Sequence, residues 1–299
     1  MNVKMIVSVC VTVCMFFLYA GLGFCQARTG GSEGAQIIEQ VGDKGKINWS
    51  EGYIDVLGGG AVDPDKIKGS NARLLCLRAA KLDAYRNFLE VVKGVQLDSA
   101  TTVKEYITQS DIINTQVRGV VRGAKPLGEP SYMSDGTCEV TLRVPFAGGF
   151  AQIILPRPLD KKPEAAPPVA PTVTAPETPA APVAPAVVYT GMVVDARGIQ
   201  ARPAMSPRIL DENGKEVYGS MNVDREYAVQ QGMSGYARDI TAAQSNPRVT
   251  NNPVSVKGIK TEGPGRSDIV ISNADAEKIR SASDNLSFLK KCRVMVVLD

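Results

Sequence analysis

Strict alternation of apolar and polar residues is clearest near the middle of the chain, over residues 138–144. The apolar positions are Cys138, Val140, Leu142 and Val144, and Glu139, Thr141 and Arg143 lie between them. A period of two is typical of a strand that buries one face, so this segment predicts a half-buried β-strand. Asp135-Gly136, just before it, indicates a turn.

Helical spacing dominates the region before this strand. Apolar residues recur near a period of 3.6 over residues 71–93 and predict a long helix with an apolar stripe, made of Leu75, Ala79, Leu82, Leu89 and Val92. Asn71 is the expected N-cap, and Gly94 is a good C-terminal stop. Thr102 and Glu105 have the spacing of a capping box, which predicts a second, shorter helix.

Two further segments complete the expected N-terminal domain. Residues 49–57 alternate in part and lead into Gly58-Gly59-Gly60, which predicts a strand followed by a turn. The Val-rich residues 117–127 also predict a strand. The expected order is therefore β-α-α-β-β, a helical layer on a small antiparallel sheet.

The C-terminal part of the chain is again predicted to mix helices and strands. Asn213-Gly214 between two apolar segments is a strong hairpin signal. Residues 293–298 are almost entirely apolar, which favours a central strand. The other expected elements are strands over 189–194, 254–259 and 268–271, a helix over 224–243, and a helix capped by Ser272 or Asn273 that ends at Arg280.

A Pro- and Ala-rich segment, residues 158–186, separates these two parts. Such a composition cannot bury enough apolar surface to offset its ordering entropy, and proline favours extended polyproline II structure. We therefore expect two small α+β domains, 45–157 and 187–299, joined by a disordered linker. Residues 28–44 are expected to be a flexible N-terminal segment.

The first 27 residues predict export. Lys4 is followed by a nearly uncharged apolar stretch and then by Cys25-Gln26-Ala27, the order of a secretory signal peptide. A retained membrane anchor is the alternative, because the stretch is about long enough to span a bilayer. Leu22 to Cys25 resembles a lipobox, so acylation of Cys25 and cleavage after Ala27 both stay open. The expected location is the periplasm, with or without attachment to the outer membrane.

Composition narrows the chemistry. Thirty-four basic and 31 acidic residues give a net charge of +3, which is too balanced for a nucleic-acid-binding surface. The chain has no histidine, which excludes Ser-His-Asp and Cys-His catalysis and His-bearing zinc sites. We therefore expect no enzyme activity, no cofactor and no metal. A carboxylate-based hydrolase using Asp211 and Glu212 is the weakest alternative, because these residues lie in the predicted hairpin turn.

Three cysteines lie outside the leader: Cys76, Cys138 and Cys292. An oxidising compartment permits one disulfide and leaves an odd thiol. Cys76 and Cys138 fall on a helix and a strand of the same predicted domain. A disulfide between them is one interpretation, and two small buried apolar side chains are the other.

Residues 49–146 resemble a bacterial envelope family. The resemblance is carried by residues 52–58, 92–95, 120–124 and 135–141, and most specifically by the pattern AAxxDAYRNFLExVKG over residues 79–94. The family includes flagellum-associated outer-membrane lipoproteins, flagellar protein P among them, and the N-terminal domain of flagellar assembly protein T. The resemblance implies a non-enzymatic, homo-oligomeric envelope component that packs with envelope or flagellar ring proteins, or a relative with another envelope role.

Two groups of polar residues are candidates for an interface. Asp83, Tyr85 and Arg86 are the polar members of the family-like pattern, and Tyr and Arg are favoured at protein interfaces. Arg197, Arg202 and Arg208 lie in one short connection, which suggests a basic loop that binds an acidic partner, a lipid headgroup or a glycan carboxylate. The leading hypothesis is a structural or assembly protein of the outer membrane or flagellar basal body. The alternative is a periplasmic binding module that uses the basic loop to bind peptidoglycan or lipid headgroups.

Overall fold

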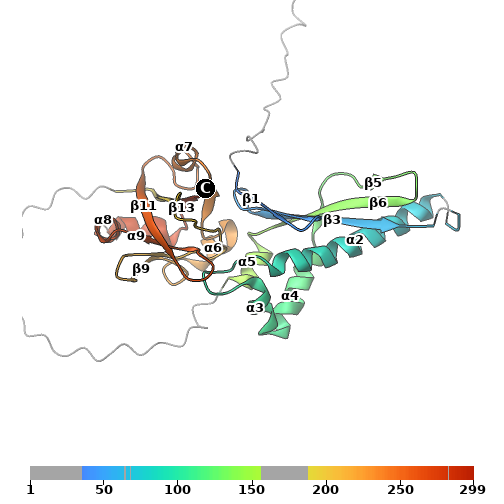
Figure 1. The fold of residues 1–299 in the computed structure, drawn as a ribbon, viewed down its shortest axis with the longest axis horizontal. Helices are drawn as coiled ribbons and strands as arrows, with labels where there is room; N and C mark the ends of the chain where they lie inside the picture. Colours follow the sequence, from blue (N-terminus) through green and yellow to red (C-terminus); the bar gives the residue numbers. More distant parts are fainter. Residues whose placement is uncertain (1–35, 64, 68, 156–187, 282) are drawn as a thin grey trace, which may run out of the picture. The chain divides into compact units, whose positions relative to one another are not determined.

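The computed structural model describes residues 36–63, 65–67, 69–155, 188–281 and 283–299 (Figure 1). The expected signal peptide, both alternatives for its processing, and the linker over 158–186 lie outside the described residues. The predicted α+β class is confirmed, because helices and strands are mixed on both sides of the linker. Among the described residues, no helix is long and apolar enough to cross a membrane.

The N-terminal part is one antiparallel sheet with helices packed on it. Its elements are β1 (Ile38–Val41), β2 (Gly45–Asn48), β3 (Tyr53–Ala61), α2 (Ser70–Lys93), α3 (Val103–Thr108), α4 (Asp111–Arg122), β4 (Lys125–Pro126), β5 (Ser131–Tyr132), β6 (Thr137–Pro145) and α5 (Gly149–Ile154). The strand order is β1-β2-β3-β6-β4, and β5 also pairs with β6. The long helix α2 runs along β3 and β6 (Figure 1).

Several local predictions are confirmed in this part. The strand over 138–144 is β6, and its alternate residues are buried as the pattern requires. Helix α2 ends at Gly94, although its N-cap is Gly69 rather than Asn71. Thr102 and Glu105 form the capping box that starts α3. Capping chemistry and strict alternation are thus readable from the sequence because both act over a few residues.

Other predictions for this part are wrong. Residues 117–122 belong to helix α4 rather than to a strand, and only Lys125–Pro126 pairs with β6. Ser110 caps this helix, and its buried residues Val117 and Val121 are four positions apart, so helical packing overrides the β preference of valine. The expected flexible segment 28–44 contains β1, which pairs with β2 and extends the sheet.

The three consecutive glycines lie inside strand β3 and do not form a turn. Helix α2 crosses this strand so closely that a Cβ at Gly58 would overlap the carbonyl oxygen of Ala80. A Cβ at Gly60 would likewise overlap the carbonyl oxygen of Cys76. Glycine inside a strand marks such a close approach of another backbone. The α2 side of this contact is also small, because it consists of Cys76, Ala80 and Ala84.

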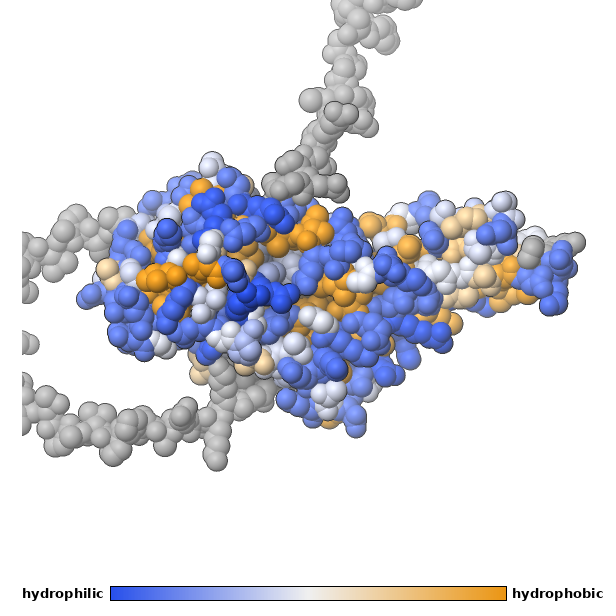
Figure 2. Space-filling view, in the orientation of Figure 1, coloured by the Kyte–Doolittle hydropathy of each residue, from blue (hydrophilic) through white to orange (hydrophobic). Residues whose placement is uncertain are grey.

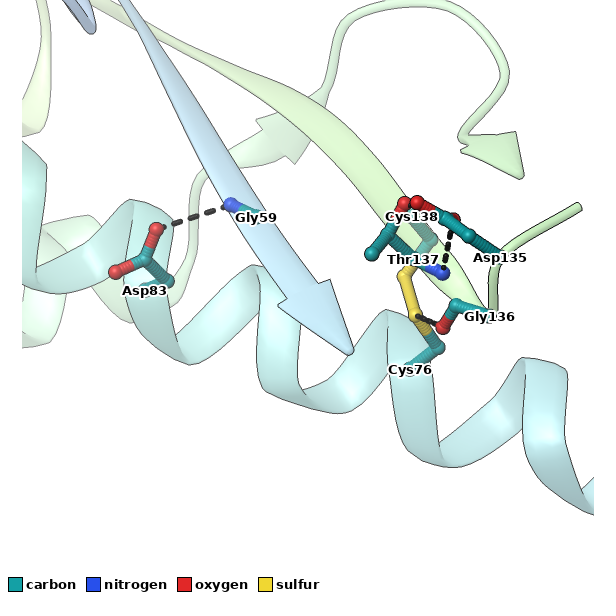
Figure 3. The surroundings of a disulfide bond; sticks show 7 residues. All are labelled: Gly59, Cys76, Asp83, Asp135, Gly136, Thr137 and Cys138. Atoms are coloured by element: carbon teal, nitrogen blue, oxygen red, sulfur yellow. Dashed lines mark hydrogen bonds between the residues drawn. A yellow bond between two sulfur atoms is a disulfide. The ribbon is translucent and has the colours of Figure 1, made fainter. Parts of the chain in front are cut away.

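A disulfide fixes the same contact. Of the two alternatives for the cysteines, the structure has the bond between Cys76 on α2 and Cys138 on β6, with Cα atoms 6.0 Å apart (Figure 3). Cys292 is the free cysteine of the described residues, and burial raises the pKa of its thiol to about 11. The helix is therefore tied covalently to the start of β6, an internal strand of the sheet.

The C-terminal part is built on a mixed sheet of order β10-β13-β7-β11-β12-β8-β9. Its elements are β7 (Gly191–Asp195), β8 (Ile209–Leu210), β9 (Glu216–Tyr218), α6 (Arg225–Gln231), β10 (Gly235–Ala237), α7 (Ile240–Gln244), β11 (Pro253–Glu262), β12 (Asp268–Ile271), α8 (Asn273–Arg280), α9 (Ser283–Lys290) and β13 (Val294–Val297). The hairpin around Asn213-Gly214 and the Ser272 cap of α8 are confirmed. β13 is an internal strand with all four residues buried, as predicted.

The prediction of one helix over residues 224–243 is wrong, because a strand interrupts it. Helix α6 ends at Gly232, whose φ of 78° no right-handed helix contains. The chain then adds β10 as a parallel neighbour of β13 before α7 begins. Pairing with β13, a strand distant in sequence, therefore outweighs the local helical spacing of these residues.

The residues that the structure describes lie in one compact unit. A single buried apolar cluster includes residues of both predicted domains, such as Trp49, Phe146 and Tyr236. The ring centroid of Trp49 lies 5.0 Å from that of Phe146 and 5.9 Å from that of Tyr236. Aromatic side chains from both predicted domains therefore contribute to this cluster.

Candidate interaction surface

Helix α2 carries apolar residues on two faces. Its inner face packs on the sheet through Cys76, Ala80, Ala84, Phe88, Val91 and Val92. The stripe expected from the sequence is largely elsewhere, because Leu75 and Leu82 remain 41% and 58% exposed and Leu74 is 55% exposed. Only Val92 of that stripe is fully buried. The small residues, and not the leucines, thus make the core contact that the close approach to Gly58 requires.

We define the outer face of α2 as Leu74, Leu75, Arg78, Leu82 and Arg86. Residues 74, 78, 82 and 86 follow one another at intervals of four, so leucine and arginine alternate along one row of the helix. Apolar and charged side chains mix on the surface over α2 (Figure 2). Large exposed apolar side chains gathered on one element are informative, whereas single ones are ordinary.

The charge of this face is positive. Arg78 and Arg86 are exposed, and within the described ranges neither has an ion-pair partner. The acids of α2 are both occupied: Asp83 lies 3.1 Å from the Nζ of Lys44, and Glu90 lies 2.8 Å from the Nζ of Lys93. No carboxylate of α2 is therefore left to neutralise the two arginines.

Asp83 stabilises the edge of strand β3. Strand β2 pairs with β3 only as far as Val56, and beyond that point the Oδ2 of Asp83 accepts the backbone N–H of Gly59 at 2.9 Å (Figure 3). Asn87, one turn later, donates its Nδ2 to the carbonyl oxygen of Leu57 at 3.0 Å. The bond from Gly59 is the main cause that lowers the pKa of Asp83. These two side chains replace the missing neighbour strand at the edge of β3.

Tyr85 and Arg86, the other two interface candidates of α2, differ in their exposure. Tyr85 is half-buried, packs against the core and donates its hydroxyl to the carbonyl oxygen of Arg122 at 3.4 Å. Arg86 is exposed on the outer face. Of Asp83, Tyr85 and Arg86, only Arg86 is thus placed to meet a partner.

The basic loop does not bring its arginines together for a ligand. Arg197 is bonded in a fork to Asp195, with nitrogen–oxygen distances of 2.8 and 2.7 Å. Arg202 lies 3.8 Å from a carboxylate oxygen of Glu39. Arg208 donates to the carboxylate of Asp268, which is 1% exposed, and this bond raises the pKa of Arg208. Each arginine therefore has a local acidic partner.

The acids suggested for hydrolysis are also used locally. The Oδ2 of Asp211 lies 2.7 Å from the Nη1 of Arg280, and the Oε2 of Glu212 accepts the backbone N–H of Asn273 at 2.9 Å. The second bond places Glu212 at the start of α8, where a carboxylate stabilises the helix. In the part of the chain that the structure describes, no three His, Cys, Asp or Glu side chains are grouped so that they could hold a metal ion.

A groove lies beside the first turn of α2. It has a volume of about 830 Å³ and is lined by residues of α2, of β5 and of the turn before β6, including Arg73, Tyr132 and Met133. The guanidinium of Arg73 lies 5.6 Å from the ring centroid of Tyr132, a cation–π distance. This cation is therefore directed toward β5 and away from the outer face.

Sequence reasoning missed Leu74 and Arg78. The sequence does contain a signal for them, because Leu74 and Leu82 are eight residues apart with Arg78 midway between them. A helix with two apolar faces must leave one uncovered unless the fold supplies a second layer, and the described residues do not supply one.

The C-terminal part of the chain matches a known family model. Residues 191–299 match a family described as the second domain of Tp0624 from Treponema pallidum. This region spans β7 to β13 and is about a third of the chain. No curated protein matches the chain.

Proposed function

We propose that this protein is a non-enzymatic, exported component of the bacterial cell envelope, and that it attaches there through the outer face of α2. The observation that carries the proposal is the uncovered row of Leu74, Leu82 and their arginine neighbours on a helix held rigidly in the fold. A rigid, preformed surface loses little conformational entropy on binding and is suited to docking.

The disulfide supports export. Bonds of this kind persist in oxidising compartments and are rare where thiols are kept reduced. Cys76 and Cys138 are buried and joined, and the chain begins with the order of residues that is expected of a leader. The two observations agree, although one comes from the folded part and the other from the sequence alone.

The use of the charged residues supports a structural role. Arg197, Arg208 and Asp211 are engaged in ion pairs that hold loops and strands of the described residues. Asp83 completes a strand edge. The resemblance of residues 49–146 to envelope proteins suggests two places of attachment, the outer membrane and the flagellar basal body.

Fractionation of cells tests this proposal. A tagged full chain with Cys25→Ser, so that no acyl chain can be attached, is compared with the same chain carrying Leu82→Gln. Ile259→Gln on β11 is the matched control, because Ile259 is 48% exposed on another element. We expect the parent and the control to sediment with the envelope and Leu82→Gln to be largely soluble.

Two results would count against the proposal. A parent protein that stays in the cytoplasmic fraction excludes export, and equal sedimentation of Leu82→Gln and the parent excludes the outer face as the point of attachment. A strain without basal bodies then separates the two places. Loss of sedimentation there assigns the protein to the basal body, and retention assigns it to another envelope site.

A further inference from the structure

We propose that the outer face of α2 binds an anionic lipid surface, with its leucines inserted among the headgroups and its arginines on the lipid phosphates. This inference rests on the proposed attachment to the envelope and names the chemistry of the partner. The partner is a bilayer that carries negative headgroups, and no particular lipid species is required.

The shape of the outer face suits a flat partner. Its members project from one side of a single straight helix, and the nearest groove lies beside the first turn and opens toward β5. Leu74 and Leu75 lie in one turn, and Leu82 lies about two turns further along the same side. A helix that lies in a membrane interface presents leucines in this way, buried a few ångströms below the headgroups.

The charge of the outer face favours an anionic surface. Arg78 and Arg86 flank Leu82 at a spacing of four residues, and Lys81 lies on the adjoining side of the helix. The long side chains of arginine can extend toward phosphates while the neighbouring leucines insert. Asp83 and Glu90 do not oppose this attraction, because lysines already neutralise both carboxylates.

The same charges argue against a second copy as the occupant of this face. Two α2 helices packed antiparallel through Leu75 and Leu82 would bring the arginines at 78 and 86 of both copies into one interface. Arginines facing each other in a desolvated contact repel, and α2 offers no free carboxylate in exchange. An acidic protein surface is the remaining occupant, and the experiment below separates it from lipid.

Flotation with lipid vesicles tests the inference. The exported full chain with Cys25→Ser is mixed with vesicles of phosphatidylcholine alone, or with vesicles that also contain about a third phosphatidylglycerol. We expect binding to the anionic vesicles only. Because each basic residue near an anionic surface contributes about fivefold to binding, Arg78→Gln with Arg86→Gln should lower the partition coefficient about 25-fold. Lys104→Gln with Arg122→Gln removes the same charge elsewhere and should change binding little.

Leucine insertion has its own test. Leu75→Gln with Leu82→Gln should lower binding at least tenfold while net charge stays the same, and Ile259→Gln should leave binding unchanged. Circular dichroism of each variant confirms that α2 is intact, since all these side chains are exposed. Raising the salt to about 0.5 M should weaken binding, because screening then acts within a few ångströms.

The outcomes separate this inference from the proposed function. Absence of binding to anionic vesicles, or equal loss in the two charge variants, overturns the lipid assignment. If cell fractionation still depends on Leu82, the proposed attachment then stands and the occupant is an acidic protein. If vesicles bind but the protein is never found at the envelope, the proposed function fails and the lipid-binding face remains.

Discussion

The disulfide between Cys76 and Cys138 gives the sharpest stability prediction. The two residues are 62 positions apart in the chain, so the bond closes a long loop in the unfolded state. The loss of chain entropy for such a loop corresponds to about 4 kcal/mol at 25 °C. Since a domain is typically stable by about 5–15 kcal/mol, we expect Cys76→Ala with Cys138→Ala to fold but to lose much of its stability.

Urea unfolding followed by tryptophan fluorescence measures this loss. The chain has one tryptophan, Trp49, and it is buried against Phe146 in the core cluster. The double variant should unfold at a markedly lower urea concentration than the oxidised parent. Addition of a reductant should shift the parent toward the double variant and leave the double variant unchanged.

Cys292→Ala is the control, because it removes a buried thiol and closes no loop. It should not abolish the response of the parent to reductant. Equal stability of the oxidised parent and the double variant would refute the entropic reasoning. Free thiols at Cys76 and Cys138 in the protein isolated from cells would refute the premise of a disulfide.

Three further predictions follow from single contacts. Gly58→Ala should cost about 3 kcal/mol or more, because its Cβ would overlap a carbonyl of α2, whereas Gly59→Ala faces open space and should cost far less in the same urea assay. Asp83→Asn should lose less stability than the parent as the pH falls below about 4. The pKa of Asp83 is lowered in the folded state, so its contribution to the free energy of unfolding is present above the ordinary pKa of 3.8 and disappears as the pH falls through the folded-state pKa. A larger loss of stability at acid pH in the variant than in the parent would contradict this. Arg208→Gln should cost about 3 kcal/mol, because it leaves the buried carboxylate of Asp268 without a cation. Arg197→Gln, whose pair with Asp195 is on the surface, should change the midpoint little. Equal effects of the two substitutions would show that burial of the partner does not matter.

Local chemistry was readable from the sequence. The alternation of β6, the capping box of α3, the Asn-Gly hairpin and the Ser272 cap all depend on residues within a few positions of one another. The class of the fold followed from these elements. Predictions of secondary structure fail where a segment distant in sequence determines the local structure. An example is β10, which forms because it pairs in parallel with β13.

The candidate surface was beyond the sequence for a related reason. Leucine is the usual core residue of a helix, so Leu75 and Leu82 were natural members of an apolar stripe. The glycines at 58 and 60 draw the alanine face of α2 onto the sheet instead, and the leucines are left outside. Predicting this requires knowing that β3 and α2 pack together, which is a tertiary contact.

Accessibility of position 82 in intact cells tests the docking role of α2 most directly. In a chain with Cys25→Ser, the Leu82→Cys variant is treated with a thiol reagent that crosses only the outer membrane, before and after detergent. The three native cysteines outside the leader should not react, since Cys76 and Cys138 are in the disulfide and burial raises the pKa of Cys292. We predict protection at position 82 until detergent is added, while Ile259→Cys reacts under both conditions. Equal labelling of the two positions in intact cells would contradict a covered outer face.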